Sequence, residues 1–294
     1  MTKVSVYDKI TNQIIELLEK GIVPWRKPWK VEGGRGGMPR NAISGKEYRG
    51  CNIFMLAMND FKSCEWLTYK QAQSLGGQVK KGEKGTEVVF WKMLDLKAVE
   101  VDEKGRRIPL LKSYYVFNVE QCEGLKVVPV IEEELEGARV FQPIEICEEK
   151  VKSFPKIEVN HHGNSACYSP LFDIVTMPMK ESFGKAEEYY HTLFHEMTHA
   201  TGHQSRLNRE GIAAVSNFGS ESYSKEELIA EMGACFLSAQ CGIEPVVIDN
   251  SASYIGNWLM KLRKDNKLVV QAAGQAQRAV DFLVGKKFEV EVEV

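Results

Sequence analysis

The sequence His-Glu-Met-Thr-His occupies positions 195–199, so that His195 and His199 are four residues apart. On an α-helix this spacing places both imidazoles on one face, about 5–6 Å apart at Cβ, close enough to bind one metal ion. Glu196 lies beside them, where its carboxylate can take a proton from metal-bound water. Gly202 is placed to end the helix. The segment therefore predicts half of a zinc site, with Glu196 as the general base.

A zinc site of this type needs a third protein ligand and an open fourth position. Glu227 and Glu231 are four residues apart in a second expected helix that is otherwise rich in apolar residues. Two carboxylates on such a helix are costly unless they meet cations or hydrogen-bond donors. One of them ligating the metal, and the other holding a ligand histidine by its second nitrogen, would satisfy both. Three alternatives remain at this point: Glu227 forms a capping box with Ser224, Glu231 is the ligand, or His203 is the ligand.

The second helix resembles that of thermolysin-like gluzincins, in which a glutamate ligand is followed four residues later by an acid that orients a ligand histidine. This resemblance implies that Glu227 is the third ligand and Glu231 the residue that holds the histidine. His191 and His203 continue the four-residue spacing, but one ion cannot reach all four histidines of a straight helix. We interpret these two as structural residues or as residues that support the ligands without binding the metal.

The elements that position these residues can be read from hydrophobic periodicity and turn residues. We expect an α+β fold with two domains and an acidic linker: residues 1–125, 126–150 and 151–294. The first domain is α+β, and the second is mainly helical, zincin-like and has a small sheet. The expected elements are helices at 6–19, 51–60 and 68–75, a hairpin at 41–49, β-rich runs at 79–94 and 110–119, two strands within 166–177, and mainly helices after 185.

Charge is distributed unevenly along the 294 residues. Residues 1–130 hold 22 Lys and Arg against 15 Asp and Glu, whereas residues 131–294 hold 16 against 25. The basic half is the candidate for binding a polyanion. The seven cysteines are scattered and include no Cys-x-x-Cys, which argues against a disulfide framework and a thiolate zinc ribbon. Without a long apolar run or a signal-peptide pattern, we expect a cytoplasmic protein with no membrane partner.

Aromatic residues are interleaved with cations in the basic half, which is the requirement for binding single strands without sequence preference. Tryptophans are commonly core residues, so each one taken singly has a structural explanation as well. Together with the charge, the pattern predicts a single-stranded DNA-binding domain. The candidate contacts are Trp25, Arg26, Lys27, Trp29, Arg35, Arg40, Tyr48, Arg49, Lys80, Lys81 and Lys84.

Both halves resemble ArdC-type antirestriction proteins. In the first half the resemblance lies in 25–29 (Trp-Arg-Lys-Pro-Trp), 41–50, 66–72 and 116–121; in the second it lies in Tyr168, Asp173, Pro178, 195–203, 205–207, 218–221 and Glu231. The resemblance implies a plasmid- or mobile-element-borne protein with a single-stranded-DNA-binding domain and a zincin-like metallopeptidase domain. It also implies protection of incoming DNA from host restriction during conjugation.

The residue patterns predict a protein that binds single-stranded DNA and holds Zn²⁺, or another divalent ion such as Mn²⁺, through His195, His199 and Glu227; the resemblance to ArdC-type proteins implies that its role is antirestriction. As a peptidase it would cleave a restriction-system or DNA-bound protein. The main alternative is a non-catalytic protein that shields DNA and has a structural or vestigial metal site. A nuclease is a third class, but it would usually need more acidic ligands around two ions.

Overall fold

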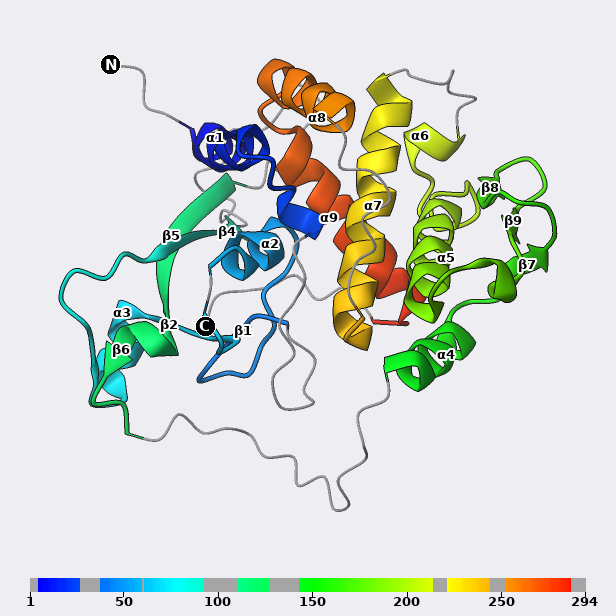
Figure 1. Cartoon of the computed structure of the whole chain (residues 1–294). Coiled ribbons are helices and arrows are strands. Elements are labelled where there is room, and N and C mark those ends of the chain that lie inside the picture. Colours follow the sequence, from blue (N-terminus) through cyan, green and yellow to red (C-terminus); the bar gives the residue numbers. More distant parts are fainter. Residues whose placement is uncertain are drawn as a thin grey trace, which may run out of the picture.

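The computed structural model describes residues 5–26, 38–59, 61–92, 110–126, 143–213, 221–243 and 252–286. It shows an N-terminal part built around a sheet, beside a mainly helical C-terminal part that carries a small sheet of its own (Figure 1). This is the fold class that the sequence predicts.

The first helix, α1 (Val6–Glu19), has the predicted bounds. The Ser5 hydroxyl accepts a hydrogen bond from the Asp8 N–H, and the Asp8 carboxylate accepts one from the Ser5 N–H, both at 3.1 Å. This reciprocal capping box satisfies two backbone donors that the helix itself leaves unpaired. Ile10, Ile14 and Leu18 form the buried face of α1, and a short 3₁₀ turn, η1 (Pro24–Arg26), follows.

The larger sheet has the strand order β1-β2-β5-β4. Strand β1 (Arg40–Asn41) pairs parallel with β2 (Glu65–Thr68), and β5 (Leu110–Asn118) pairs antiparallel with both β2 and β4 (Thr86–Lys92). The last two strands lie in the predicted β-rich runs. The hairpin expected at 41–49 is only a turn closed by a bridge between Arg40 and Glu47, because β1 pairs with β2 instead.

Helices α2 (Cys51–Ala57) and α3 (Tyr69–Ser74) confirm two further predicted helices. Asn52 of α2 fixes this helix to the sheet, since its amide both donates to the Val89 carbonyl and accepts from the Val89 N–H, at 2.7 Å each. A second, two-stranded sheet joins β3 (Gln78–Val79) to β6 (Cys122–Glu123), which follows the 3₁₀ turn η2 (Val119–Gln121).

The C-terminal part has a three-stranded sheet in the order β7-β9-β8, made of β7 (Glu158–His161), β8 (Cys167–Ser169) and β9 (Ile174–Met177). Strands β8 and β9 were predicted and β7 was not. Helix α4 (Pro143–Ser153) precedes the sheet; η3 (Lys180–Ser182), α5 (Ala186–Ala200), α6 (Glu210–Ala213), α7 (Glu221–Cys241), α8 (Ala252–Lys264) and α9 (Leu268–Leu283) follow it. Within the described residues no helix is both long and apolar enough to cross a bilayer.

One hydrophobic core runs through both parts of the chain. It includes Ile10 and Ile14 of α1, Trp25 and Phe54, together with buried residues of α5, α7 and α9. In space, α1 packs on α8 and α9, η1 on α7, and α2 on α9. The packing therefore does not follow a division at residue 125, and α4 begins at Pro143, inside the range 126–150 predicted as a linker. The proposed domain limits remain predictions.

Candidate metal centre

Helix α5 carries the predicted histidine pair, and it lies close against α7. Its apolar residues Tyr189, Leu193, Phe194 and Met197 are buried in the core. A Cβ placed on Gly233 of α7 would come within 2.6 Å of Thr198 of α5, so this glycine permits the close approach of the two helices. The approach brings the first part of α7 beside the last two turns of α5, where both histidines lie.

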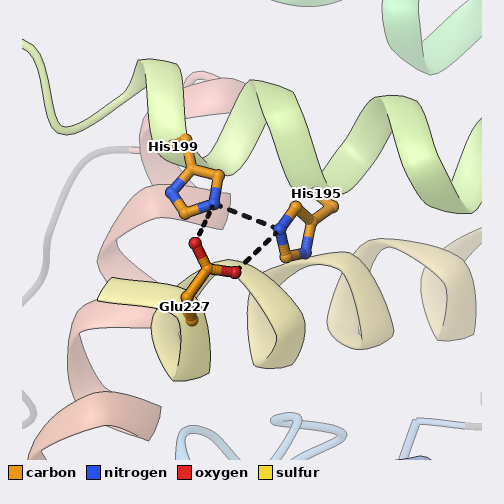
Figure 2. A group of neighbouring side chains, drawn as sticks. All are labelled: His195, His199 and Glu227. Carbon is orange, nitrogen blue, oxygen red and sulfur yellow. Dashed lines mark hydrogen bonds and ion pairs between the residues drawn. The ribbon is translucent and has the colours of Figure 1, made fainter. Parts of the chain in front are cut away.

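His195, His199 and Glu227 point toward a common centre between α5 and α7 (Figure 2). The Nε2 atoms of the two histidines are 3.1 Å apart, and each lies 3.6 Å from an oxygen of the Glu227 carboxylate. One candidate ligand atom from each residue lies within 4.8 Å of the others. The structure thus brings together the three side chains that the sequence predicts as ligands.

The donor set fits a small divalent cation. Zinc–ligand bonds of about 2.0–2.1 Å in tetrahedral geometry place the ligand atoms roughly 3.3 Å from one another. The separations of 3.1 and 3.6 Å bracket that value. Two imidazoles and a carboxylate are also the chemistry of a site that leaves its fourth position open. These residues could therefore hold a metal ion and still admit a water or substrate molecule.

Glu226, rather than Glu231, holds a candidate ligand histidine. Its carboxylate lies 3.3 Å from His199 Nδ1, and because an ionised carboxylate only accepts, the imidazole must donate from that nitrogen. This tautomer leaves the Nε2 lone pair free for a metal. The Arg209 guanidinium donates to the same carboxylate from Nε at 2.9 Å and from Nη2 at 2.6 Å. Burial tends to raise the pKa of Glu226, but these hydrogen bonds outweigh it and hold the pKa below its ordinary value of 4.5.

The Glu231 carboxylate faces the N-terminal part of the chain, which corrects the role expected for it. It accepts from Trp25 Nε1 at 3.1 Å, pairs with the Arg26 guanidinium, and accepts from the Tyr254 hydroxyl. Glu231 lies one turn beyond Glu227, where α7 passes η1 and α8, whereas Glu226 of α7 faces His199 near the end of α5. The sequence analysis did not single out Glu226, because which carboxylate faces the histidine depends on how α7 is rotated about its axis.

Negative charge surrounds the histidine pair. Burial tends to lower the pKa of His195, but the hydrogen bond to Glu227 and the charges of Glu196 and Glu227 raise it above the ordinary 6.5. One turn earlier, burial and the positive charges of His195 and Arg26 lower the pKa of His191 to about 3. His191 is therefore neutral at pH 7. The negative charge around His195 and His199 thus favours binding of a cation between them. The neutral His191 lies outside this group of three.

Glu196 is buried, and within the described part of the chain no hydrogen-bond donor engages its carboxylate. It lies on α5 beside the candidate ligands. A carboxylate without a structural partner remains available to accept a proton, which is what the role predicted for Glu196 requires.

The other polar residues considered from the sequence lie outside the group of three. His203 Nδ1 contacts the Ser205 hydroxyl at 2.7 Å. The Tyr168 hydroxyl donates to Asp173 at 2.8 Å, and Arg206 pairs with the same carboxylate and donates to the Ala200 carbonyl at 2.7 Å. This cluster ties the end of α5 to the turn between β8 and β9.

The candidate nucleic-acid contacts are spread over several places, and the side chains of Lys27, Trp29 and Arg35 lie outside the described residues. Trp25 and Arg26 are buried against α7 and α8, so they do not offer the stacking face and free cation expected of them. Arg40 pairs with Glu65, Arg49 pairs with Asp281, and Tyr48 packs against the small buried cluster that includes Trp66. Lys80, Lys81 and Lys84 are exposed in the loop before β4.

Comparison with known proteins covers both parts of the chain. Residues 4–117 match the family described as the N-terminal domain of anti-restriction factor ArdC, and residues 148–275 match the family described as zincin-like metallopeptidase. The Mn(II)-bound crystal structure of the antirestriction ArdC protein from plasmid R388 is 38% identical, with a TM-score of 0.73 over 96% of this chain and 98% of that one. Its metal-free structure is 37% identical, with a TM-score of 0.71 over 95% and 96% of the two chains.

A curated relative extends the similarity to a longer protein. The DNA primase TraC of Escherichia coli is 32% identical over 95% of this chain. The present chain spans only 20% of the length of that protein. The shared region is therefore one portion of TraC.

Proposed function

Because the chain belongs to the ArdC family of antirestriction proteins, we propose that it protects incoming plasmid or mobile-element DNA from host restriction. It would do so in the cytoplasm of the recipient cell, where that DNA enters as a single strand. The observation that carries the proposal is the convergence of His195, His199 and Glu227 in a chain that matches ArdC over nearly its whole length.

The site would hold Zn²⁺ or Mn²⁺ through the Nε2 atoms of the two histidines and the Glu227 carboxylate. The Mn(II)-bound form of the R388 protein supports a divalent ion here. Such an ion supplies Lewis acidity, which polarises a carbonyl and lowers the pKa of water. Glu226 and Arg209 would keep His199 in the tautomer that presents Nε2.

Glu196 would act as the general base of a peptidase reaction. Its carboxylate, which no described side chain engages, would take the proton from attacking water and return it to the leaving amine. The substrate would be a restriction-system protein or a protein bound to DNA. The family match to zincin-like metallopeptidases supports this assignment.

Binding of single-stranded DNA would bring the metal centre to its target. The basic composition of residues 1–130 supports this role, and so does the likeness to a DNA primase. In a salt titration the affinity of the full chain for an oligonucleotide should fall steeply as salt rises.

The test compares the wild type with Glu196→Gln in three measurements: metal content, single-strand binding, and protection of an incoming plasmid in a restricting host. Glu196→Gln should keep the metal and the DNA binding and lose protection. If protection is retained with the substitution, the peptidase role is refuted, and the protein shields DNA while the metal site is structural or vestigial.

A nuclease is the third possibility. Among the described residues the candidate metal ligands form one group of three, rather than the carboxylate-rich pair of sites usual for two-ion catalysis. We therefore expect labelled single strands to stay intact when they are incubated with the protein and Mn²⁺ or Zn²⁺.

A further inference from the structure

Exposed tyrosines gather on the N-terminal sheet. Among the described residues, the exposed tyrosines are Tyr69, Tyr114 and Tyr115, and all three lie on or beside strands β2, β4 and β5. Tyr69 is 51% exposed and Tyr115 is 54% exposed. Tyr114 and Tyr115 are consecutive on β5, so they point to opposite faces of the sheet. The two most exposed rings are those of Tyr69 and Tyr115, and large exposed aromatic residues grouped on one face indicate an interaction surface.

Tyr115, Phe117 and Tyr69 share one side of this sheet. Tyr115 and Phe117 are two residues apart on β5, and alternate residues of a strand point to the same face. The Tyr69 ring meets the Phe117 ring edge-to-face, with the ring centroids 6.5 Å apart. Phe117 in turn packs on a small buried cluster that includes Leu67, which holds it in place between the two tyrosines.

Lysines border this aromatic face. The loop that leads into β4 places Gly85 against it: a Cβ on Gly85 would lie 3.0 Å from Phe117 and 3.1 Å from Tyr115. The preceding residue, Lys84, is exposed, as are Lys81 in the same loop and Lys70, which follows Tyr69 on α3. Their ammonium groups are therefore carried on the chain segments that flank the rings.

Among the described residues, two glutamates lie on the segments that flank these rings. Glu87, paired with Tyr115 across the strands, is buried and accepts from Lys9 at 3.1 Å and from the Ser113 hydroxyl at 2.6 Å. Glu83 accepts from the Gln121 amide at 2.8 Å. Lys9 offsets the charge of Glu87, whereas Glu83, bonded to a neutral amide, keeps its charge. Among the described residues, Lys70, Lys81 and Lys84 therefore outnumber Glu83 on the segments that flank the rings.

We infer that Tyr69, Phe117 and Tyr115, with Lys70, Lys81 and Lys84, form the surface on which single-stranded nucleic acid binds. This inference rests on the DNA binding proposed above and assigns it to a specific place on the fold. Exposed rings can stack on bases only where the bases are unpaired, and flanking lysines can track the phosphates. This face combines exposed aromatic rings with flanking lysines.

This surface replaces Trp25 as the predicted stacking site. Trp25 is buried, hydrogen-bonded to Glu231 and packed edge-to-face against Trp258 at 6.1 Å between ring centroids. A base could reach its ring only if η1 left the core. In Figure 1 the sheet with β5 and α3 lies on the opposite side of α7 from α5, so a strand bound there would leave the metal helices uncovered.

The first experiment measures the affinity of the full-length protein for a fluorescent oligothymidylate at low salt. Stacking contributes about 1–3 kcal/mol per base, so Tyr69→Ala and Tyr115→Ala should each raise the Kd about fivefold or more. Tyr69→Phe and Tyr115→Phe keep the ring and should bind like the wild type. The matched control is Phe172→Ala in the turn after β8, where the ring is 72% exposed, and it should leave the Kd unchanged.

The second experiment needs no variant and avoids effects on folding. Photo-crosslinking of wild-type protein to an iododeoxyuridine oligonucleotide, followed by peptide mapping, should locate the crosslinks at Tyr69, Tyr115 or Phe117. Binding by wild type with unchanged Kd in folded alanine variants, or crosslinks confined to other segments, would overturn this surface but leave the proposed function standing. Absence of any binding by the wild type would overturn both.

Discussion

Replacing Arg26 by alanine should destabilise the whole fold, although this residue precedes the predicted peptidase half by more than 100 positions. The Arg26 guanidinium pairs with the Glu231 carboxylate in the interior, where the two side chains are 7% and 12% exposed. It also lies 4.2 Å from the centre of the Tyr254 ring. The substitution would remove the cation and leave the carboxylate buried.

The size of the effect follows from what remains around Glu231. Removing one partner of a buried ion pair costs about 3–5 kcal/mol. Trp25 Nε1, at 3.1 Å, and the Tyr254 hydroxyl would still donate to the carboxylate, so we expect a loss near the lower end, about 3 kcal/mol. Urea unfolding followed by circular dichroism and tryptophan fluorescence measures this free energy of unfolding directly.

The matched control is another arginine pair on the surface. Arg263 and Glu19 lie 2.6 Å apart, but their side chains are 59% and 48% exposed. Arg263→Ala should therefore cost at most about 1 kcal/mol. A free energy of unfolding for Arg26→Ala within about 1 kcal/mol of that for Arg263→Ala would refute the reasoning. The double variant Arg26→Met with Glu231→Gln should be more stable than Arg26→Ala, because it leaves no unpaired charge.

Two further predictions concern the metal helices, and a third concerns the ion pair between Asp173 and Arg206. Glu226→Gln should weaken binding of Zn²⁺ or Mn²⁺ about 10–100-fold in a competition titration, because residues that orient a ligand histidine have effects of this size; unchanged affinity would contradict the assignment. Gly233→Ala should cost about 1–3 kcal/mol in urea unfolding, since its Cβ would overlap Thr198, and a neutral result would mean that the helices can separate freely. Hydrogen bonds from Arg206 hold the pKa of Asp173 below its ordinary 3.8, although burial opposes this. Its contribution to stability is therefore present above pH 3.8 and lost as the pH falls through the lower folded-state pKa. Asp173→Asn should destabilise the protein at pH 7 and lose that effect at the most acidic pH; a destabilisation that does not change with pH would argue against the ion pair.

Local sequence signals predicted the elements that position the site. The helical spacing of the apolar residues at 10, 14, 17 and 18 indicates α1, and Thr68 is a suitable N-cap for α3. The spacing of His195 and His199 places the two imidazoles on one face of α5. Each of these signals acts within a few residues, so it can be read without knowledge of the tertiary fold.

The parts that escaped prediction depend on contacts between distant segments. Which of Glu226 and Glu231 meets a histidine depends on the rotation of α7 against α5. Trp25 and Arg26 are buried because they bond to Glu231, which lies more than 200 positions further along the chain. The residues around Trp25 give no sign of this distant partner. The parallel pairing of β1 with β2, likewise, cannot be inferred from a turn sequence that by itself suggests a hairpin.

The packing of α1 on α8 and α9 limits how far the chain can fold while it is still being synthesised. The Thr11 hydroxyl donates to the Asn266 carbonyl at 2.7 Å, a contact between residues 255 positions apart. Until α8 and α9 have been synthesised, the apolar face of α1 has no native surface to cover it, and such long-range contacts form slowly. A nascent chain that stalls before α9, or an expressed fragment ending near residue 125, would expose Ile10, Ile14 and Leu18 to chaperones and to other chains. Synthesis of α9 is thus the step that supplies the remaining native cover for the apolar face of α1.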